Sequence, residues 1–209
     1  MKRILVTYAT LAGSTGEVAQ VVGDVIAQNG LQVEVQPLSE VKSLEGYDGV
    51  VLGGPMIMGW HRAALGFLRK YRNNWRQIPL AIFVTAMSLT QTGETNVDGV
   101  PMVVDEKLPK PPEQQGRLNF RERYARLANY VRPILRATRP VTPVSVGVFG
   151  GRLEYGRLKW WAVLFAMVII RAPAGDRRNW TAIRLWAAEL PIVFQSDVSK
   201  AAESAPVVV

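Results

Sequence analysis

The chain contains no cysteine and a single histidine, His61, among its 209 residues. The absence of cysteine excludes disulfides, thiol catalysis and cysteine-ligated metals, and one histidine is too few for a metal site built from several. Long apolar runs are also absent, because the run from Trp160 to Ile170 has only eleven residues and a membrane-spanning helix needs about 20. The sequence therefore predicts no bound metal and no membrane-spanning segment.

Acidic residues are scarce relative to basic ones, with 17 Asp and Glu against 25 Lys and Arg and a net charge of +8. This balance favours an anionic partner, which is a membrane surface, a carboxylate substrate or a nucleic acid. No nucleic-acid motif is present, so no nucleic-acid partner is predicted. The first three residues lead into a strand and not into the apolar region of a signal peptide, which predicts that the folded part is cytoplasmic.

Strand and helix patterns alternate along the chain and predict an α/β fold with a parallel sheet. The predicted strands are Arg3–Tyr8, Leu31–Gln36, Gly49–Leu52, Leu80–Ala86 and Val144–Phe149, and the predicted helices are Thr15–Asn29, Ala63–Trp75, Arg121–Leu135 and Trp180–Leu190. Residues 1–190 are expected to form one domain, with a mobile surface loop or an insertion over about 88–119 and a flexible tail over 191–209.

The most informative segment is the loop between the first strand and the first helix, which contains Thr10, Leu11, Ala12, Gly13, Ser14 and Thr15. Small and hydroxyl residues before a helix leave free backbone N–H groups, which suit a phosphate. The loop has neither the Gly-Lys-Ser/Thr ending of a Walker loop nor the G-x-G-x-x-G of a dinucleotide site. The alternative is an ordinary helix N-cap after a strand.

The spacing Thr10-x-x-Gly13-x-Thr15 resembles the flavodoxin phosphate loop, from which Ala12 departs by removing one hydroxyl. The resemblance implies a flavodoxin-like three-layer sandwich with strand order 2-1-3-4-5 and a ligand site at the carboxyl ends of the strands. The phosphate then belongs to FMN, bound mainly by backbone amides together with Thr10, Ser14 and Thr15.

Two later loops are expected to lie beside the flavin ring in this fold. The residues predicted to contact the cofactor there are Pro55, Met56, Ile57, Met58, Gly59 and Trp60 after the third strand, and Thr85, Ala86, Met87, Ser88 and Leu89 after the fourth. The apolar residues of the first loop can instead pack into the core. His61 is a weak catalytic candidate, and a structural role at the start of a helix is the alternative.

The last predicted strand leads into Gly150 and Gly151, which are also assigned to the cofactor, and then into the apolar run. Two tryptophans at the start of this run and basic residues on both sides favour a helix over about 159–171 that lies at a membrane interface. Residues 157–171 are accordingly predicted to meet an anionic surface, on the inner face of the cell membrane. A core helix or a homodimer interface is the alternative.

The chain resembles the menaquinone-dependent protoporphyrinogen oxidases of the flavodoxin type. The resemblance rests on the phosphate loop, the Gly-Trp-His segment before the second helix, the Gly-Gly-Arg-Leu-x-Tyr segment and the apolar helix. The resemblance implies an FMN-dependent dehydrogenase of heme biosynthesis that passes electrons from a porphyrinogen-like substrate to a membrane quinone. Arg152, Tyr155 and Arg157 are then candidates to bind substrate carboxylates. A flavodoxin-like electron carrier without its own substrate, and an interaction module that has lost FMN, are the rival interpretations.

Overall fold

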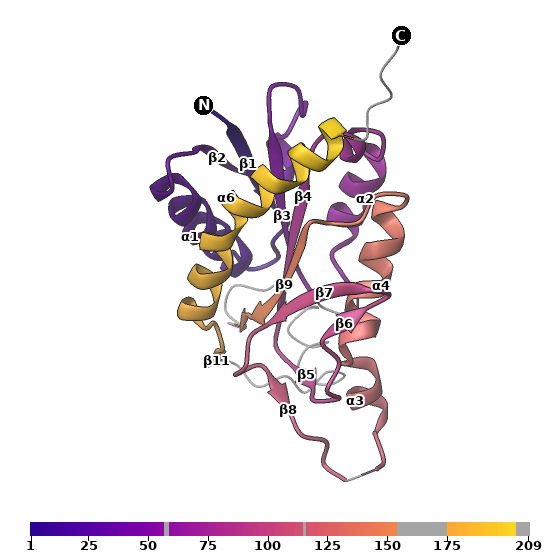
Figure 1. The fold of residues 1–209 in the computed structure, drawn as a ribbon. Helices are drawn as coiled ribbons and strands as arrows, with labels where there is room; N and C mark the ends of the chain where they lie inside the picture. Colours follow the sequence, from indigo (N-terminus) through magenta and orange to yellow (C-terminus); the bar gives the residue numbers. More distant parts are fainter. Residues whose placement is uncertain (57–58, 115, 154–174, 204–209) are drawn as a thin grey trace.

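A computed structural model describes residues 1–56, 59–114, 116–153 and 175–203 of the chain, and Figure 1 shows its strands and helices alternating. The main elements are β1 (Arg3–Tyr8), α1 (Ser14–Gln28), β2 (Gln32–Pro37), β3 (Gly49–Pro55), α2 (Arg62–Lys70), β4 (Leu80–Ala86), α4 (Leu127–Thr138), β9 (Ser145–Gly150) and α6 (Trp180–Glu203). Short 3-10 helices, η1 (Leu38–Glu40) and η2 (Asn74–Arg76), follow β2 and α2. The α/β class predicted from the sequence is confirmed.

The central sheet has the strand order β2-β1-β3-β4-β9-β7-β6. Its first five strands are parallel and follow the predicted order 2-1-3-4-5. Every residue of β3 and β4 is buried, because helices cover both faces of a parallel sheet and its central strands lie inside the molecule.

Two helical layers enclose the sheet. On one face, α1 and α6 pack over the strands, and the side chains of Val22, Ile26, Trp186, Leu190 and Phe194 are buried among them. On the other face, α2 and α4 enclose a second core, which contains Trp75 and Ile134. Figure 1 shows these two layers on opposite sides of the sheet. The sheet lies between these two layers, and the ends of its strands form the candidate site described below.

The segment predicted to be a mobile surface loop or an insertion contains short strands and a helix, which agrees with an insertion and not with a mobile loop. The sheet has seven strands, whereas five were predicted. The segment contains β5 (Leu89–Thr90), β6 (Asn96–Val97), β7 (Val100–Val104), β8 (Pro109–Lys110) and α3 (Phe120–Tyr124). Strand β7 pairs with β9 and β6 pairs with β7, so the segment extends the sheet at its β9 edge. The many prolines and glycines of this segment predict a loop, so these short strands were not predicted. The strands are stabilised by pairing with residues that are distant in the sequence.

The C-terminal part also differs from expectation. Helix α6 runs on to Glu203, although the sequence predicts an end at Leu190 and a flexible tail over 191–209. The reason is tertiary packing, because Phe194 is buried and its ring lies close to Gly49 of β3. The predicted apolar helix over about 159–171 lies outside the described residues.

Candidate functional site

The loop between β1 and α1 has the backbone geometry of an anion site. Gly13 caps α1 with a left-handed φ of 88°, and its N–H donates to the hydroxyl oxygen of Thr10 at 2.9 Å. The carbonyl of Gly13 accepts the N–H groups of Gly16 and Glu17. Among the described residues, the N–H groups of Ser14 and Thr15 have no acceptor, so they point their dipoles at the space before the helix. These open donors fit a phosphate.

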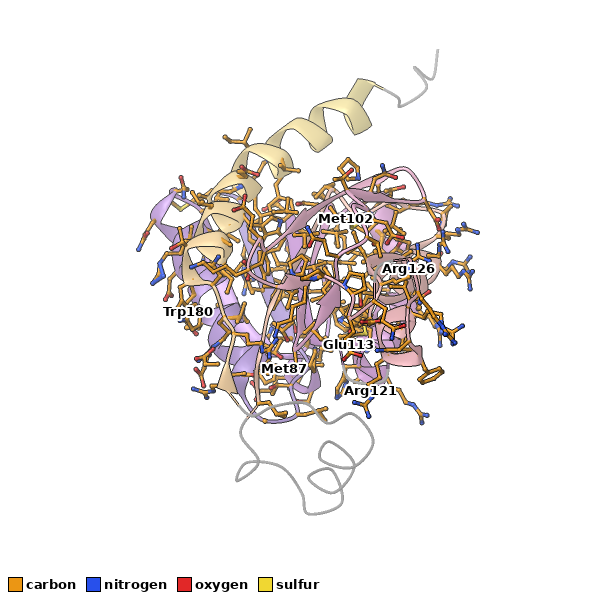
Figure 2. The ribbon with its side chains drawn as sticks, turned by 90° about the horizontal axis from the view of Figure 1, so that it is seen from below. Met87, Met102, Glu113, Arg121, Arg126 and Trp180 are labelled. Atoms are coloured by element: carbon orange, nitrogen blue, oxygen red, sulfur yellow. The ribbon has the colours of Figure 1, made fainter. Side chains whose placement is uncertain are left out.

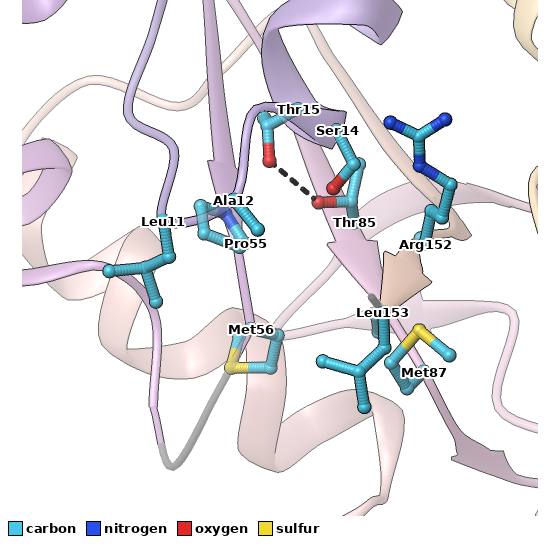
Figure 3. A pocket seen from close by; sticks show the side chains of 12 residues that line it. Leu11, Ala12, Ser14, Thr15, Pro55, Met56, Thr85, Met87, Arg152 and Leu153 are labelled. Atoms are coloured by element: carbon cyan, nitrogen blue, oxygen red, sulfur yellow. Dashed lines mark hydrogen bonds between the residues drawn. The ribbon is translucent and has the colours of Figure 1, made fainter. Parts of the chain in front are cut away.

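The hydroxyl groups of this loop are used differently from one another. The hydroxyl of Thr15 lies 3.2 Å from that of Thr85 at the end of β4, and both side chains are buried. The hydrogen bond ties the phosphate loop to the neighbouring strand (Figure 3). Thr10 closes the loop as an acceptor. The backbone amides, together with the hydroxyl of Ser14 in the cavity wall, are therefore donors available to an anion.

A cavity at the carboxyl ends of the parallel strands joins four segments that are far apart in the sequence. The segments are the phosphate loop and the ends of β3, β4 and β9, as Figure 3 shows. The lining residues are Leu11, Ala12, Ser14, Thr15, Pro55, Met56, Thr85, Ala86, Met87, Gly151, Arg152 and Leu153. This edge of the sheet is where ligands bind in open α/β folds. The convergence of the three loops predicted from the sequence is therefore observed.

Several residues assigned to the cofactor lie beside the cavity without lining it. Trp60 is buried and its indole N–H donates to the carbonyl of Gly54 at 3.0 Å, so it packs into the core behind the loop. Ser88 is exposed, and its carbonyl accepts the hydroxyl of Tyr130 at 3.0 Å. The remaining such residues are Thr10, Gly13, Gly59, Leu89 and Gly150. Ile57 and Met58 lie outside the described residues.

Burial raises the pKa of Tyr130 to about 12. The phenol therefore stays protonated at ordinary pH and keeps donating to Ser88. Tyr130 belongs to α4, so this contact fixes the loop after β4 from the helical layer beneath it. Sequence reasoning missed it, because nothing local pairs residue 130 with residue 88.

His61 begins helix α2. Its Nδ1 accepts the N–H of Ala63 at 3.3 Å, which is a helix N-cap. Burial lowers the pKa of the imidazole below its ordinary value, because the charged form loses hydration. The neutral ring is the form that can accept this hydrogen bond, so the geometry and the pKa agree on a capping role.

The exit of β9 is shaped by close backbone contacts. A side chain on Gly150 would place its Cβ 1.9 Å from the carbonyl oxygen of Arg177, so the position requires glycine. The N–H of Gly151 donates to the carbonyl of Ala86, and its own carbonyl accepts the N–H of Arg177. Short strands β10 (Arg152–Leu153) and β11 (Gly175–Asp176) pair immediately afterwards. The glycine pair lets the returning chain lie against the end of β9.

A buried carboxylate supports the same exit. Asp105 follows β7 and is 1% exposed. It accepts the side-chain amide of Asn179 at 2.9 Å and the backbone N–H of Lys107 at 3.0 Å, and the N–H of Gly150 lies 3.5 Å away. Asp105 thus joins the insertion, the end of β9 and the start of α6.

Arg152 lines the cavity within an ion-pair network that sequence reasoning did not foresee. Its guanidinium donates to Glu17 of α1 at 2.5 Å, and Glu17 also accepts Arg178 at 2.6 Å. The side chain of Arg178 is only 4% exposed and pairs as well with Asp176, whose pKa it lowers. The only available signal was an acid in the first turn of α1. Tyr155 and Arg157 lie outside the described residues.

Two other kinds of site are a metal centre and a membrane-spanning helix. Within the described ranges, no group of three or more His, Asp or Glu side chains is placed to hold a metal ion. None of the helices that the structure describes is both long enough and apolar enough to cross a bilayer.

Comparison with known proteins gives a family and a fold. The family model of the flavodoxin domain matches residues 5–178, and no curated protein matches the chain. The flavodiiron protein of Giardia intestinalis is 9% identical, with a TM-score of 0.51 over 99% of this chain and 38% of that one. The flavodoxin of Fusobacterium nucleatum bound to flavin mononucleotide is 14% identical, with a TM-score of 0.49 over 92% and 98%.

A short-chain flavodoxin associated with a bacterial microcompartment is 19% identical, with a TM-score of 0.38 over 41% of this chain, which spans 62% of that flavodoxin. These likenesses to solved structures concern the fold, whereas the family model covers most of the sequence. The chain therefore belongs to the flavodoxin domain family, whose cofactor is FMN, as the phosphate loop predicted.

Proposed function

We propose that this chain is an FMN-dependent electron-transfer protein that exchanges electrons with a separate redox partner. The observation that carries the proposal is the meeting of open N–H donors in the phosphate loop with the ends of β3 and β4 at one cavity. When bound, FMN supplies the redox chemistry at its ring, and the protein supplies position and electrostatics.

The residues present fit each part of that cofactor. The N–H groups of Ser14 and Thr15 are placed to hold the phosphate, at the positive end of the α1 dipole. Met56, Met87 and Leu153 offer apolar side chains in the cavity wall, where they would exclude water from a flavin ring. Hydrogen bonds from Met56 to the Thr85 carbonyl and from Gly151 to the Ala86 carbonyl hold these walls together.

The test is an absorbance spectrum of the chain purified without added flavin, followed by titration with FMN and with riboflavin. We expect flavin absorbance and a clear preference for FMN, because the phosphate loop acts only on the phosphate. Equal affinity for FMN and riboflavin would contradict the proposed phosphate site. A protein that binds neither would leave only an interaction module.

A second candidate is the oxidation of a porphyrinogen-like substrate with transfer of electrons to a quinone. Arg152 favours it, because a guanidinium in the cavity wall suits a substrate carboxylate. Such a carboxylate must compete with Glu17, which already accepts Arg152 at 2.5 Å. The carrier needs no such exchange, which is why it is the leading proposal.

One experiment separates the two functions. The holoprotein is mixed anaerobically with protoporphyrinogen and, separately, with a reduced carrier protein or dithionite, and flavin bleaching is followed. Bleaching by protoporphyrinogen with reoxidation by menaquinone supports the dehydrogenase. Bleaching by the reduced carrier protein but not by protoporphyrinogen supports the electron carrier, and dithionite serves only to show that the flavin can be reduced.

A further inference from the structure

The short helix α3 carries an exposed aromatic ring between two arginines. Phe120 is 76% exposed, and Arg121 and Arg123 are exposed beside it. Successive residues of a helix are turned by about 100°, so Phe120 lies between the two arginines on one outer arc and Glu122 lies on the opposite side. The arrangement presents one apolar group flanked by two cations.

Two acidic residues beside α3 accept hydrogen bonds: Glu113, which is exposed and accepts the side-chain amide of Asn119 at 3.2 Å, and Glu122. Glu122 accepts the N–H groups of Glu113 and Asn119 at 2.7 and 2.8 Å, and Asn119 in return caps Glu122. This capping box fixes the first turn of α3 and leaves the arc basic. Across the described ranges, Arg117, Arg121 and Arg123 have no ion-pair partner, whereas Arg126 pairs with Glu94.

The segments that supply α2 and α4 are basic as well, whereas residues 94–122 between them contain six Asp and Glu against four Lys and Arg. Residues 49–93 contain five Lys and Arg and no acid, and residues 123–153 contain six and no acid. These two segments supply α2 and α4, which pack together over one face of the sheet. Helix α3 lies at the lower end of this layer in Figure 1, at the same end of the molecule as β11. Figure 2 shows Arg121 at the rim when the molecule is viewed from below.

We propose that α3 docks this protein on an anionic lipid surface, with Phe120 entering the headgroup region and Arg117, Arg121 and Arg123 pairing with lipid phosphates. Interfacial binding combines an apolar group that enters the headgroup region with cations that attract anionic lipid, and α3 presents both kinds of group. A stable protein interface needs a central apolar cluster, and the other large apolar side chains exposed in the described part of the chain lie on other elements. Charge and shape therefore favour lipid over an acidic protein.

The test is flotation of the full-length holoprotein with vesicles of phosphatidylcholine alone and with 30 mol% phosphatidylglycerol, at about 0.1 M salt, where charges still act over roughly 10 Å. We expect binding only to the anionic vesicles. The double variant Arg121→Gln/Arg123→Gln should reduce the partition coefficient on the order of tenfold or more. Each cation near an anionic lipid surface adds a similar attraction, and this variant removes two of them.

Three further variants separate the contributions of charge and of the aromatic ring. Arg69→Gln/Lys70→Gln removes the same charge from the end of α2 and should cost less than a third of the α3 effect. Phe120→Ser should weaken binding on the order of tenfold and Phe120→Trp should retain it, because the ring and not the charge is changed. FMN affinity should not change in any of them.

Three outcomes would overturn the proposal. One is equal or absent binding to the two vesicle types by the wild-type protein. Another is an equal loss from the α2 and α3 variants, which would show a diffuse effect of net charge. The third is an α3 variant that binds vesicles normally but loses binding to an acidic protein or to DNA.

Discussion

The phosphate loop and the exit of β9 line the same cavity, but they are held by different kinds of contact. The phosphate loop is closed by neighbours in sequence, such as the Gly13 N–H on the Thr10 hydroxyl. The β9 exit is closed by distant ones: Arg177 lies against Gly150, Ala86 pairs with Gly151, and Glu17 holds Arg152. The phosphate loop is thus held mainly by a few consecutive residues, with the Thr15–Thr85 hydrogen bond as its tie to β4, whereas the β9 exit is held by residues far apart in the sequence.

This difference has an energetic consequence. A local loop loses one hydrogen bond when a residue changes, and that costs about 1 kcal/mol. A wall built from close-packed backbone has no room to relax, so even one added methyl group lowers the stability of the fold there. We therefore expect substitutions at the β9 exit to affect stability and substitutions in the phosphate loop to affect ligand affinity.

The largest effect is expected for Gly150→Ala. The new Cβ would stand 1.9 Å from the Arg177 carbonyl oxygen, so the returning chain must move, and we expect a loss of about 3 kcal/mol in unfolding free energy. Gly151→Ala is the matched control, because its Cβ would meet its nearest atoms at 3.6 Å and should cost less than about 1 kcal/mol. Urea unfolding measures both. Similar costs at the two positions would refute the distinction.

Glu17→Gln should rank second. It removes the carboxylate shared by Arg152 and Arg178, of which Arg178 is almost fully buried, and a cation left with one partner fewer is costly. Because Glu17 itself is 41% exposed, screening reduces the cost to about 1–2 kcal/mol.

Asp24→Asn on the same helix is the control for Glu17→Gln, since Asp24 is exposed and accepts the side-chain amide of Gln20, one turn away on the same helix, at 2.9 Å. It should change stability by less than about 0.5 kcal/mol. An equal effect of the two substitutions would mean that the network at the β9 exit adds nothing beyond a surface charge.

Thr10→Val tests the local wall. It keeps the side-chain shape and removes the acceptor of the Gly13 N–H, so the loop amides lose their fixed orientation. We expect FMN affinity to fall about fivefold, the equivalent of one hydrogen bond of about 1 kcal/mol. Quenching of flavin fluorescence during titration provides the measurement.

Thr10→Ser retains the hydroxyl and should bind FMN like the wild type. If valine and serine bind alike, the side chain of residue 10 does not organise the loop. If both variants unfold readily while the remaining fraction binds normally, the loop is a stability element like the β9 exit, and the contrast between the two walls fails.

The contrast also explains how much the sequence could reveal. The bounds of β1 and β4 were predicted to the residue, and the phosphate loop was identified from its spacing, because apolar periodicity and small residues are local signals. The two extra strands of the sheet were missed, since β6 and β7 together have seven residues and acquire strand structure by pairing with β9. Segments of two to five residues are too short to show the alternation of apolar and polar residues that identifies a strand.

The ion pairs of the site were missed for a related reason. Glu17 and Arg178 are 161 residues apart, and no pattern along the chain couples a first-turn acid to a cation near the other end. The prediction for Trp60 as a wall beside the flavin stays untested, and the structure gives its indole a core position on the Gly54 carbonyl. Gly54 permits that packing, because a Cβ at this position would lie 2.6 Å from the indole nitrogen.

The smallest effect is expected at His61, the cap of α2 at the end of the β3 loop. Its Nδ1 must be unprotonated to accept the Ala63 N–H, and burial lowers its pKa in the folded state below the ordinary 6.5. The stabilisation is therefore complete above pH 6.5 and is lost as the pH falls through the lower folded-state pKa. His61→Asn keeps a capping acceptor that does not titrate, so it should remove this step while costing no more than about 0.5 kcal/mol at pH 7.5. Unfolding curves at pH 7.5 and 5.5 measure the difference. A step that persists in the asparagine variant would assign the pH dependence to another group and leave His61 free for the catalytic role considered from the sequence.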